Sequence, residues 1–88
     1  MNFLKYELDL GAGDLIEVHL DRQANVRLLD SSNFASYRNG GAHRCLGGLV
    51  RVSPYRVRAP HAGRWYVVVD LGGYAGSVRA SVQVRSAA

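Results

Sequence analysis

The chain has 88 residues, of which 48% are hydrophobic, 20% charged and 9% aromatic, and its formal net charge is +4. This length is enough for one domain, residues 1–88, and the composition is that of a soluble globular protein, which excludes a disordered chain. The longest apolar run, residues 65–69, is far shorter than the ~20 residues that span a bilayer, which excludes a transmembrane helix.

The sequence also indicates the compartment. No basic start followed by a 7–15-residue apolar stretch is present, so we find no secretion signal. Cys45 is the only cysteine, which excludes an internal disulfide and favours a reducing compartment. We therefore expect a cytoplasmic protein that does not bind membranes.

The first two predicted strands cover residues 4–10 and 16–20. In both, apolar residues alternate with polar ones, which is typical of a strand with one face in the core. The segment Gly11–Asp14 joins them and has the composition of a tight turn. This arrangement predicts a β-hairpin.

The next strand contains Val26 and Leu28, which point inward on either side of Arg27. After it, residues 32–38 begin with a serine that suits a helix N-cap and end before two glycines, which predicts a single helical turn or a structured loop. The surrounding segment, residues 30–41, is rich in polar side chains and predicts a ligand pocket or an interface. The alternative is a capped turn whose side chains satisfy their own backbone.

The second half of the chain contains the remaining predicted strands. Gly47 and Gly48 interrupt a strand-like stretch, where we expect a β-bulge rather than a close approach of the backbone. Residues 55–58 and 78–85 alternate between apolar and polar, whereas residues 65–69 are apolar at both parities. This pattern predicts that residues 65–69 form a central strand covered on both faces.

These elements predict an all-β fold. About seven short strands, separated by turns at 8–12-residue spacing, favour a small antiparallel β-sandwich or a jelly-roll-like barrel with at most one short helical turn. The glycine-rich segment 72–76 lies between two strands and lacks a following helix, so we interpret it as a connecting loop and not as a phosphate-binding loop.

Acidic and basic residues are segregated along the chain. Residues 1–30 hold six acidic and three basic residues, whereas residues 31–69 hold six arginines and no acidic residue. Such a polarised domain can offer a face for anions, or an acidic face that meets the basic face of a second copy. The sequence leaves both interpretations open.

The arginines of the second segment are candidates for an anion site, because guanidinium groups bind phosphate and carboxylate in a bidentate manner. Arg56 and Arg58 share one strand face, and Arg51 is expected to join them from a neighbouring strand. The alternative is a solvated face that protects a sheet edge. With the polar segment and the glycine loop, the candidate ligand-binding residues are Ser32, Asn33, Tyr37, Arg38, Arg51, Arg56, Arg58 and Tyr74.

Metal-binding and catalytic patterns are weak. Of the histidines, only His43 lies close to Cys45, and zinc sites need two such clusters of ligands. A nucleophile set of Asp30, His61 and one serine lacks the required sequence context, whether the serine is Ser31, Ser32 or Ser53. We therefore expect no metal, no cofactor and no enzymatic activity.

Several motifs resemble the bacterial domain-of-unknown-function 1883 family over essentially the whole chain. They are the run 24–34, the pair Gly47–Gly48, Ser53–Pro54, the turn 60–63 with Trp65 after it, and residues 69–73. The resemblance implies a compact β domain without an assigned activity, attached in some relatives ahead of a Toll/interleukin-receptor-type domain. A weaker similarity to pre-peptidase C-terminal sandwich domains concerns architecture alone.

The sequence thus predicts a non-enzymatic binding or assembly module. Its expected partner is an anionic small molecule or a protein, which includes a second copy of itself as a homo-oligomer. The alternative is a nucleic-acid-binding β domain, supported by the basic segment and by aromatic residues suited to base stacking, namely Phe34, Tyr37, Tyr55 and Tyr74.

Overall fold

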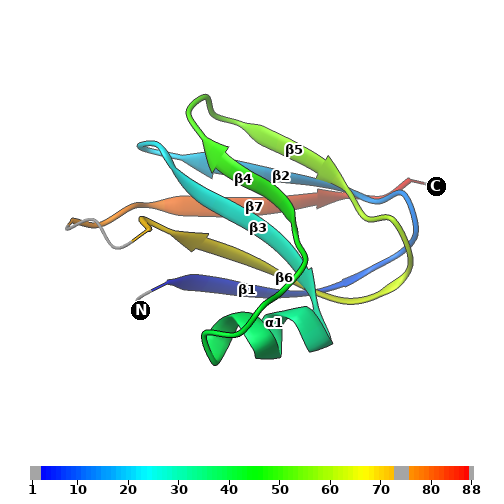
Figure 1. The fold of residues 1–88 in the computed structure, drawn as a ribbon. Coiled ribbons are helices and arrows are strands. Elements are labelled where there is room, and N and C mark those ends of the chain that lie inside the picture. Colours follow the sequence, from blue (N-terminus) through cyan, green and yellow to red (C-terminus); the bar gives the residue numbers. More distant parts are fainter. Residues whose placement is uncertain (1–2, 73–75, 88) are drawn as a thin grey trace.

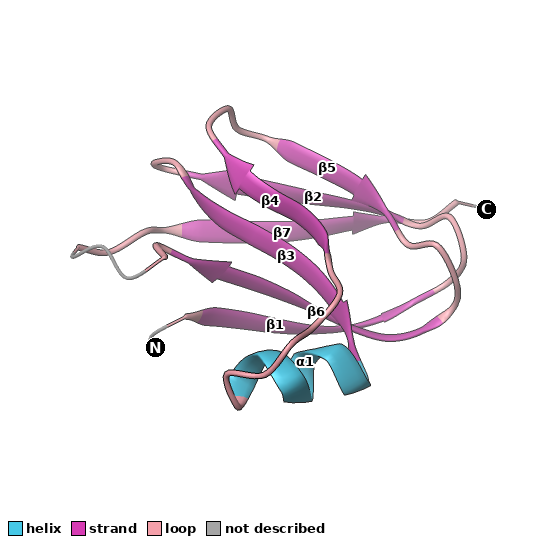
Figure 2. Ribbon diagram, viewed as in Figure 1, coloured by secondary structure: helices cyan, strands magenta, loops and turns pink. Residues whose placement is uncertain are grey.

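A computed structural model of the chain describes residues 3–72 and 76–87. Within these residues it contains seven strands and one helix (Figures 1 and 2). In chain order the elements are β1 (Leu4–Leu10), β2 (Leu15–Leu20), β3 (Ala24–Asp30), α1 (Ser31–Arg38), β4 (Leu46–Val50), β5 (Tyr55–Arg58), β6 (Gly63–Asp70) and β7 (Ala80–Arg85).

The strands form two antiparallel sheets. Sheet A has the order β1-β6-β3-β4, and sheet B has the order β5-β2-β7. The apolar faces of both sheets meet in one core, which contains Ile16 and Val18 of β2 and Val26 and Leu28 of β3. The predicted all-β sandwich of about seven strands is therefore confirmed.

The predicted hairpin of the first two strands is wrong. β1 pairs with β6, whereas β2 pairs with β5 and β7, so β1 and β2 lie in different sheets. The turn between them is fixed elsewhere: Gly13 N–H donates to the Ala59 carbonyl at 2.8 Å, and Ala59 N–H donates to the Asp14 carbonyl at 2.9 Å. The chain therefore passes from one sheet to the other here. The sequence did not predict this, because alternation determines which face of a strand is buried but not which strand is its partner.

β6 is the central strand that its apolar pattern predicts. Val67 and Val69 lie in the core between the sheets, and Val68 on the opposite face packs with Leu29 beneath α1. All three valines are at most 1% exposed. β6 also pairs with a strand on each side, β1 and β3, so it is covered on both faces and at both edges.

Helix α1 is longer than the predicted single turn. Asp30, rather than a serine, is its N-cap, because the Asp30 carboxylate accepts the Asn33 N–H at 2.9 Å. The helix covers the outer face of sheet A with Phe34 and Tyr37, and the Phe34 ring stacks on Tyr66 at 4.4 Å between centroids. This packing stabilises two turns that the short apolar pattern does not predict.

The expected bulge at the glycine pair is also absent. The pairing of β4 with β3 runs from Leu46 to Val50 without a skipped residue. Gly47 has φ of 103°, and a Cβ placed there would lie 2.2 Å from the Val26 carbonyl oxygen. Glycine is required because the two backbones approach closely, which is the alternative that the sequence left open.

Candidate functional site

Strand pairing cancels much of the charge segregation seen along the sequence. The Arg64 guanidinium on β6 bonds Asp9 at 2.7 Å and Glu7 at 3.2 Å, both on neighbouring β1. The hydrogen bond and the charge of Arg64 lower the pKa of Asp9. Acidic residues of the first segment thus meet arginines of the second within one molecule, and fewer arginines remain for a partner.

Arg56 and Arg58 share a face of β5, as predicted. Arg56 Nε donates to Glu17 Oε2 at 2.6 Å and thereby lowers the pKa of Glu17, while Arg58 Nη1 donates to the Gly13 carbonyl at 2.9 Å. Arg51 does not join them, because it follows β4 and β4 belongs to the other sheet. The structure therefore does not assemble the expected three-arginine site.

The polar residues around α1 serve mainly local structure. Asp30 accepts hydrogen bonds from the Ser32 hydroxyl at 3.2 Å and the Asn33 side-chain amide at 2.9 Å. Asn33 Oδ1 in turn accepts the Arg44 N–H at 2.7 Å. Arg38 places its guanidinium 5.7 Å from the centre of the Phe34 ring. Ser32 and Asn33 thus take part in the helix cap. This agrees with the alternative interpretation of residues 30–41, a capped turn whose polar side chains satisfy their own backbone.

Tyr37 belongs to a buried network centred on Asp70 rather than to an open ligand site. Its hydroxyl donates to Asp70 Oδ2 at 2.8 Å, and Arg27 Nη1 donates to the same oxygen. Asp70 Oδ1 accepts the Asn25 amide at 2.9 Å and the Gly72 N–H at 2.8 Å. We call these five residues the Asp70 network; it joins α1, β3 and the end of β6.

The pKa values in this network follow from burial and from hydrogen bonding. Burial by itself raises the pKa of Asp70, but the hydrogen bonds from Asn25, Tyr37 and Gly72 and the charge of Arg27 outweigh it, so the pKa lies below its ordinary value. Burial and the bond to Asp70 raise the pKa of Tyr37. The network therefore holds a carboxylate anion and a neutral phenol at physiological pH.

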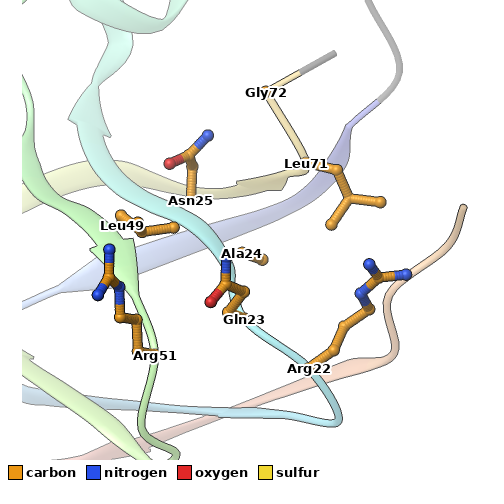
Figure 3. Close-up of a pocket in the computed structure, with 8 residues that line it drawn as sticks. All are labelled: Arg22, Gln23, Ala24, Asn25, Leu49, Arg51, Leu71 and Gly72. Carbon is orange, nitrogen blue, oxygen red and sulfur yellow. The ribbon is translucent and has the colours of Figure 1, made fainter. Parts of the chain in front are cut away.

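A pocket opens beside the Asp70 network, where β3 begins and β4 and β6 end. Its volume is about 660 Å³. In Figure 3 the Arg22 and Arg51 side chains lie on opposite sides of the pocket, with Gln23 and Asn25 between them. We call it the arginine pocket; its lining residues are Arg22, Gln23, Ala24, Asn25, Leu49, Arg51, Leu71 and Gly72.

The chemistry of the arginine pocket suits an anion. Among the described residues neither Arg22 nor Arg51 forms an ion pair, and Arg22 makes one long hydrogen bond of 3.4 Å to the Ser77 carbonyl. The nearby carboxylate of Asp70 is already neutralised by Arg27. The pocket therefore offers two guanidinium groups and two amide side chains without a competing acid.

The whole chain, residues 1–88, matches the model of a family described as Domain of unknown function (DUF1883). The chain belongs to the DUF1883 family. The resemblance stated from the sequence motifs is thereby confirmed, whereas the architectural similarity to pre-peptidase C-terminal domains stays a prediction. No curated protein and no solved structure matches this DUF1883 chain.

Metal-ligating residues do not cluster in the described part of the DUF1883 chain: no group of three or more His, Cys, Asp or Glu residues is placed to hold an ion. His61 lies against the Trp65 ring at 4.7 Å between centroids, and Cys45 is exposed. No helix in residues 3–72 and 76–87 is long and apolar enough to cross a membrane. Tyr74, a predicted ligand residue, lies outside the described residues.

Of the residues that line the arginine pocket of this DUF1883 domain, the sequence predicted only Arg51 as a ligand-binding residue. It missed Arg22, Gln23 and Asn25, which stand in and after the short turn between β2 and β3. The available signal was the polar run of residues 21–23, followed by Asn25, between two alternating strands. Its meaning depends on the crossing order of sheet A, which places the start of β3 between the ends of β4 and β6.

Proposed function

We propose that this DUF1883 domain is a non-enzymatic binding module that takes an anionic small molecule in the arginine pocket. Arg22 and Arg51 bind the anionic group, and the amides of Gln23 and Asn25 orient the polar part of the ligand. Binding begins with attraction of the anion by the net positive charge of +4 and ends with short-range hydrogen bonds.

The observation that carries this proposal is the contrast between the pocket arginines and those that form ion pairs. Arg27, Arg56 and Arg64 each bond a carboxylate of the same chain. Arg22 and Arg51 do not, within the described residues, although both line one concavity. Cations kept without a counter-charge in a concave site are placed for an external anion.

Two leucines that line the arginine pocket indicate that the ligand also has an apolar part. Leu49 lies beside Arg51 and Leu71 beside Arg22 (Figure 3), and Leu49 is 51% exposed. An apolar part of the ligand would cover them and remove that surface from water. The pocket therefore suits an anion with an apolar portion better than inorganic phosphate.

Binding is tested by calorimetric titration with a panel of nucleotides, sugar phosphates and carboxylates that carry apolar portions. We expect one class to bind, and Arg22→Gln or Arg51→Gln to weaken its affinity at least tenfold, because each removes a charge-assisted hydrogen bond worth about 1.5–3 kcal/mol. Thermal stability should change little, since neither arginine forms an ion pair in the described structure.

The control is Arg79→Gln, which removes an exposed arginine that does not line the pocket. If it weakens binding as much as Arg22→Gln, binding reflects net charge and the pocket assignment fails. Short oligonucleotides in the same panel test the nucleic-acid alternative, for which two of the expected stacking residues, Phe34 and Tyr37, are only 6% and 4% exposed. Tight, steeply salt-dependent oligonucleotide binding would favour that alternative.

A further inference from the structure

The edge strands of the two sheets differ in how they are protected. Sheets A and B end in β1, β4, β5 and β7. Three of these strands carry charged side chains, among them Glu7 on β1, Arg56 on β5 and Arg85 on β7. Charges on an edge strand discourage pairing with another chain. β4, with the sequence Leu-Gly-Gly-Leu-Val, has none.

β4 is also unusually exposed and apolar. Within the described residues it pairs with β3 alone, so no described strand pairs with its other edge, although Tyr55 of β5 reaches toward Gly47. Leu46 is 40% exposed, Leu49 is 51% exposed, and Val52 just beyond the strand is 78% exposed. An edge that combines free backbone hydrogen-bonding groups with exposed apolar side chains is a template for an added strand.

We propose that the open edge of β4, residues 46–50, binds an extended segment of a partner protein whose centre is apolar and whose ends are acidic. The acidic ends are chosen to match two arginines, Arg44 and Arg51, which flank β4. Both arginines are exposed, and neither forms an ion pair in the described residues. The partner backbone pairs with β4, and its carboxylates meet the two arginines.

The same arginines argue against a second copy of this chain as the occupant. If two copies of β4 paired antiparallel about Gly48, Arg51 of one copy would lie opposite Cys45 of the other, and Arg44 opposite Val52. Each end of the paired strands would then bring two arginines together, and no acidic residue occurs between Asp30 and Asp70 to separate them. Like charges placed side by side disfavour this dimer, whereas an acidic partner relieves them.

The test uses a nine-residue peptide with alternating valine and threonine in its centre and two glutamates at each end. Fluorescence polarisation compares it with the same peptide carrying lysines at its ends. We expect the glutamate peptide to bind at least tenfold more tightly, with affinity that falls as salt rises. Leu46→Glu should weaken it at least tenfold, and Arg44→Gln should weaken it and reduce its salt dependence.

Leu4→Glu is the matched control, since Leu4 is 37% exposed on β1, the opposite edge of the same sheet. It should leave binding unchanged. If Leu46→Glu fails to fold by circular dichroism, Val52→Glu replaces it. Absent binding, equal binding of both peptides, or equal loss in Leu4→Glu overturns the proposal. A dimer in light scattering that Leu46→Glu dissociates overturns it too, because the edge would then hold a second copy.

Discussion

At the scale of single residues, the least expected feature is the Asp70 network. The side chain of Asp70 is fully buried and accepts hydrogen bonds from four residues on three parts of the chain. Sequence patterns predicted the inward valines of β3 and β6 well, because burial follows period-2 alternation. They did not predict this network, because its polar members meet only through the pairing of β3 with β6 and the packing of α1.

The hydroxyl of Tyr37 should contribute measurably to stability. Tyr37→Phe removes its donor to the buried Asp70 carboxylate, and a hydrogen bond to a charged group contributes about 1.5–3 kcal/mol. We expect the free energy of unfolding, measured in urea, to fall by that amount. Tyr66→Phe is the control, because Tyr66 stacks on Phe34 and no hydrogen bond of its hydroxyl is found in the described structure. Equal losses in both variants would contradict this role.

At the scale of elements, strands were easier to predict than their partners or the helix. The double-sided apolar pattern of residues 65–69 correctly predicted a covered central strand. The turn at Gly11–Asp14 was misread as a hairpin, since its true partner, Ala59, lies far along the chain. Helix α1 was underestimated because its two turns depend on packing of Phe34 and Tyr37 against sheet A, which no local pattern reveals.

The glycine pair of β4 provides a matched test at this scale. In Gly47→Ala the new Cβ would lie 2.2 Å from the Val26 carbonyl, at a φ of 103° that alanine rarely adopts. We expect a loss of about 2–3 kcal/mol in the free energy of unfolding. Gly48→Ala meets nothing within 4 Å and needs no unusual φ, so it should change stability little. Comparable thermal melting of the two variants would show that β3 and β4 are not this close.

At the scale of the whole molecule, the sequence predicted the fold class but not which positive charges remain without an acidic partner. Antiparallel pairing brings Glu7, Asp9 and Glu17 against Arg64 and Arg56, so part of the charge segregation along the sequence is neutralised within the molecule. Of the arginines that form no ion pair within the described residues, Arg22 and Arg51 lie together in one pocket. Locating them required the sheet order, which composition and spacing do not contain.

The paired carboxylates predict how stability depends on pH. Hydrogen bonds and charges of arginines lower the pKa of Asp9 and Glu17 in the folded state, below ordinary values of 3.8 and 4.5. The unfolded chain therefore takes up protons first as the pH falls. We expect the free energy of unfolding in urea to be constant above about pH 5 and to decrease below it. Asp9→Asn should reduce this slope, and a stability that is unchanged down to pH 3 would contradict the ion pairs.

The pairing of β1 with β6 has a consequence for how the chain folds. Leu4 lies opposite Val69, and β2, also near the start of the chain, needs β7, where Leu15 lies opposite Arg85. A ribosome therefore releases the first two strands long before their partners exist. Such distant contacts slow folding, because a long loop must close before any pairing stabilises it. We therefore expect that neither half of the chain folds alone and that the domain folds and unfolds as one cooperative unit.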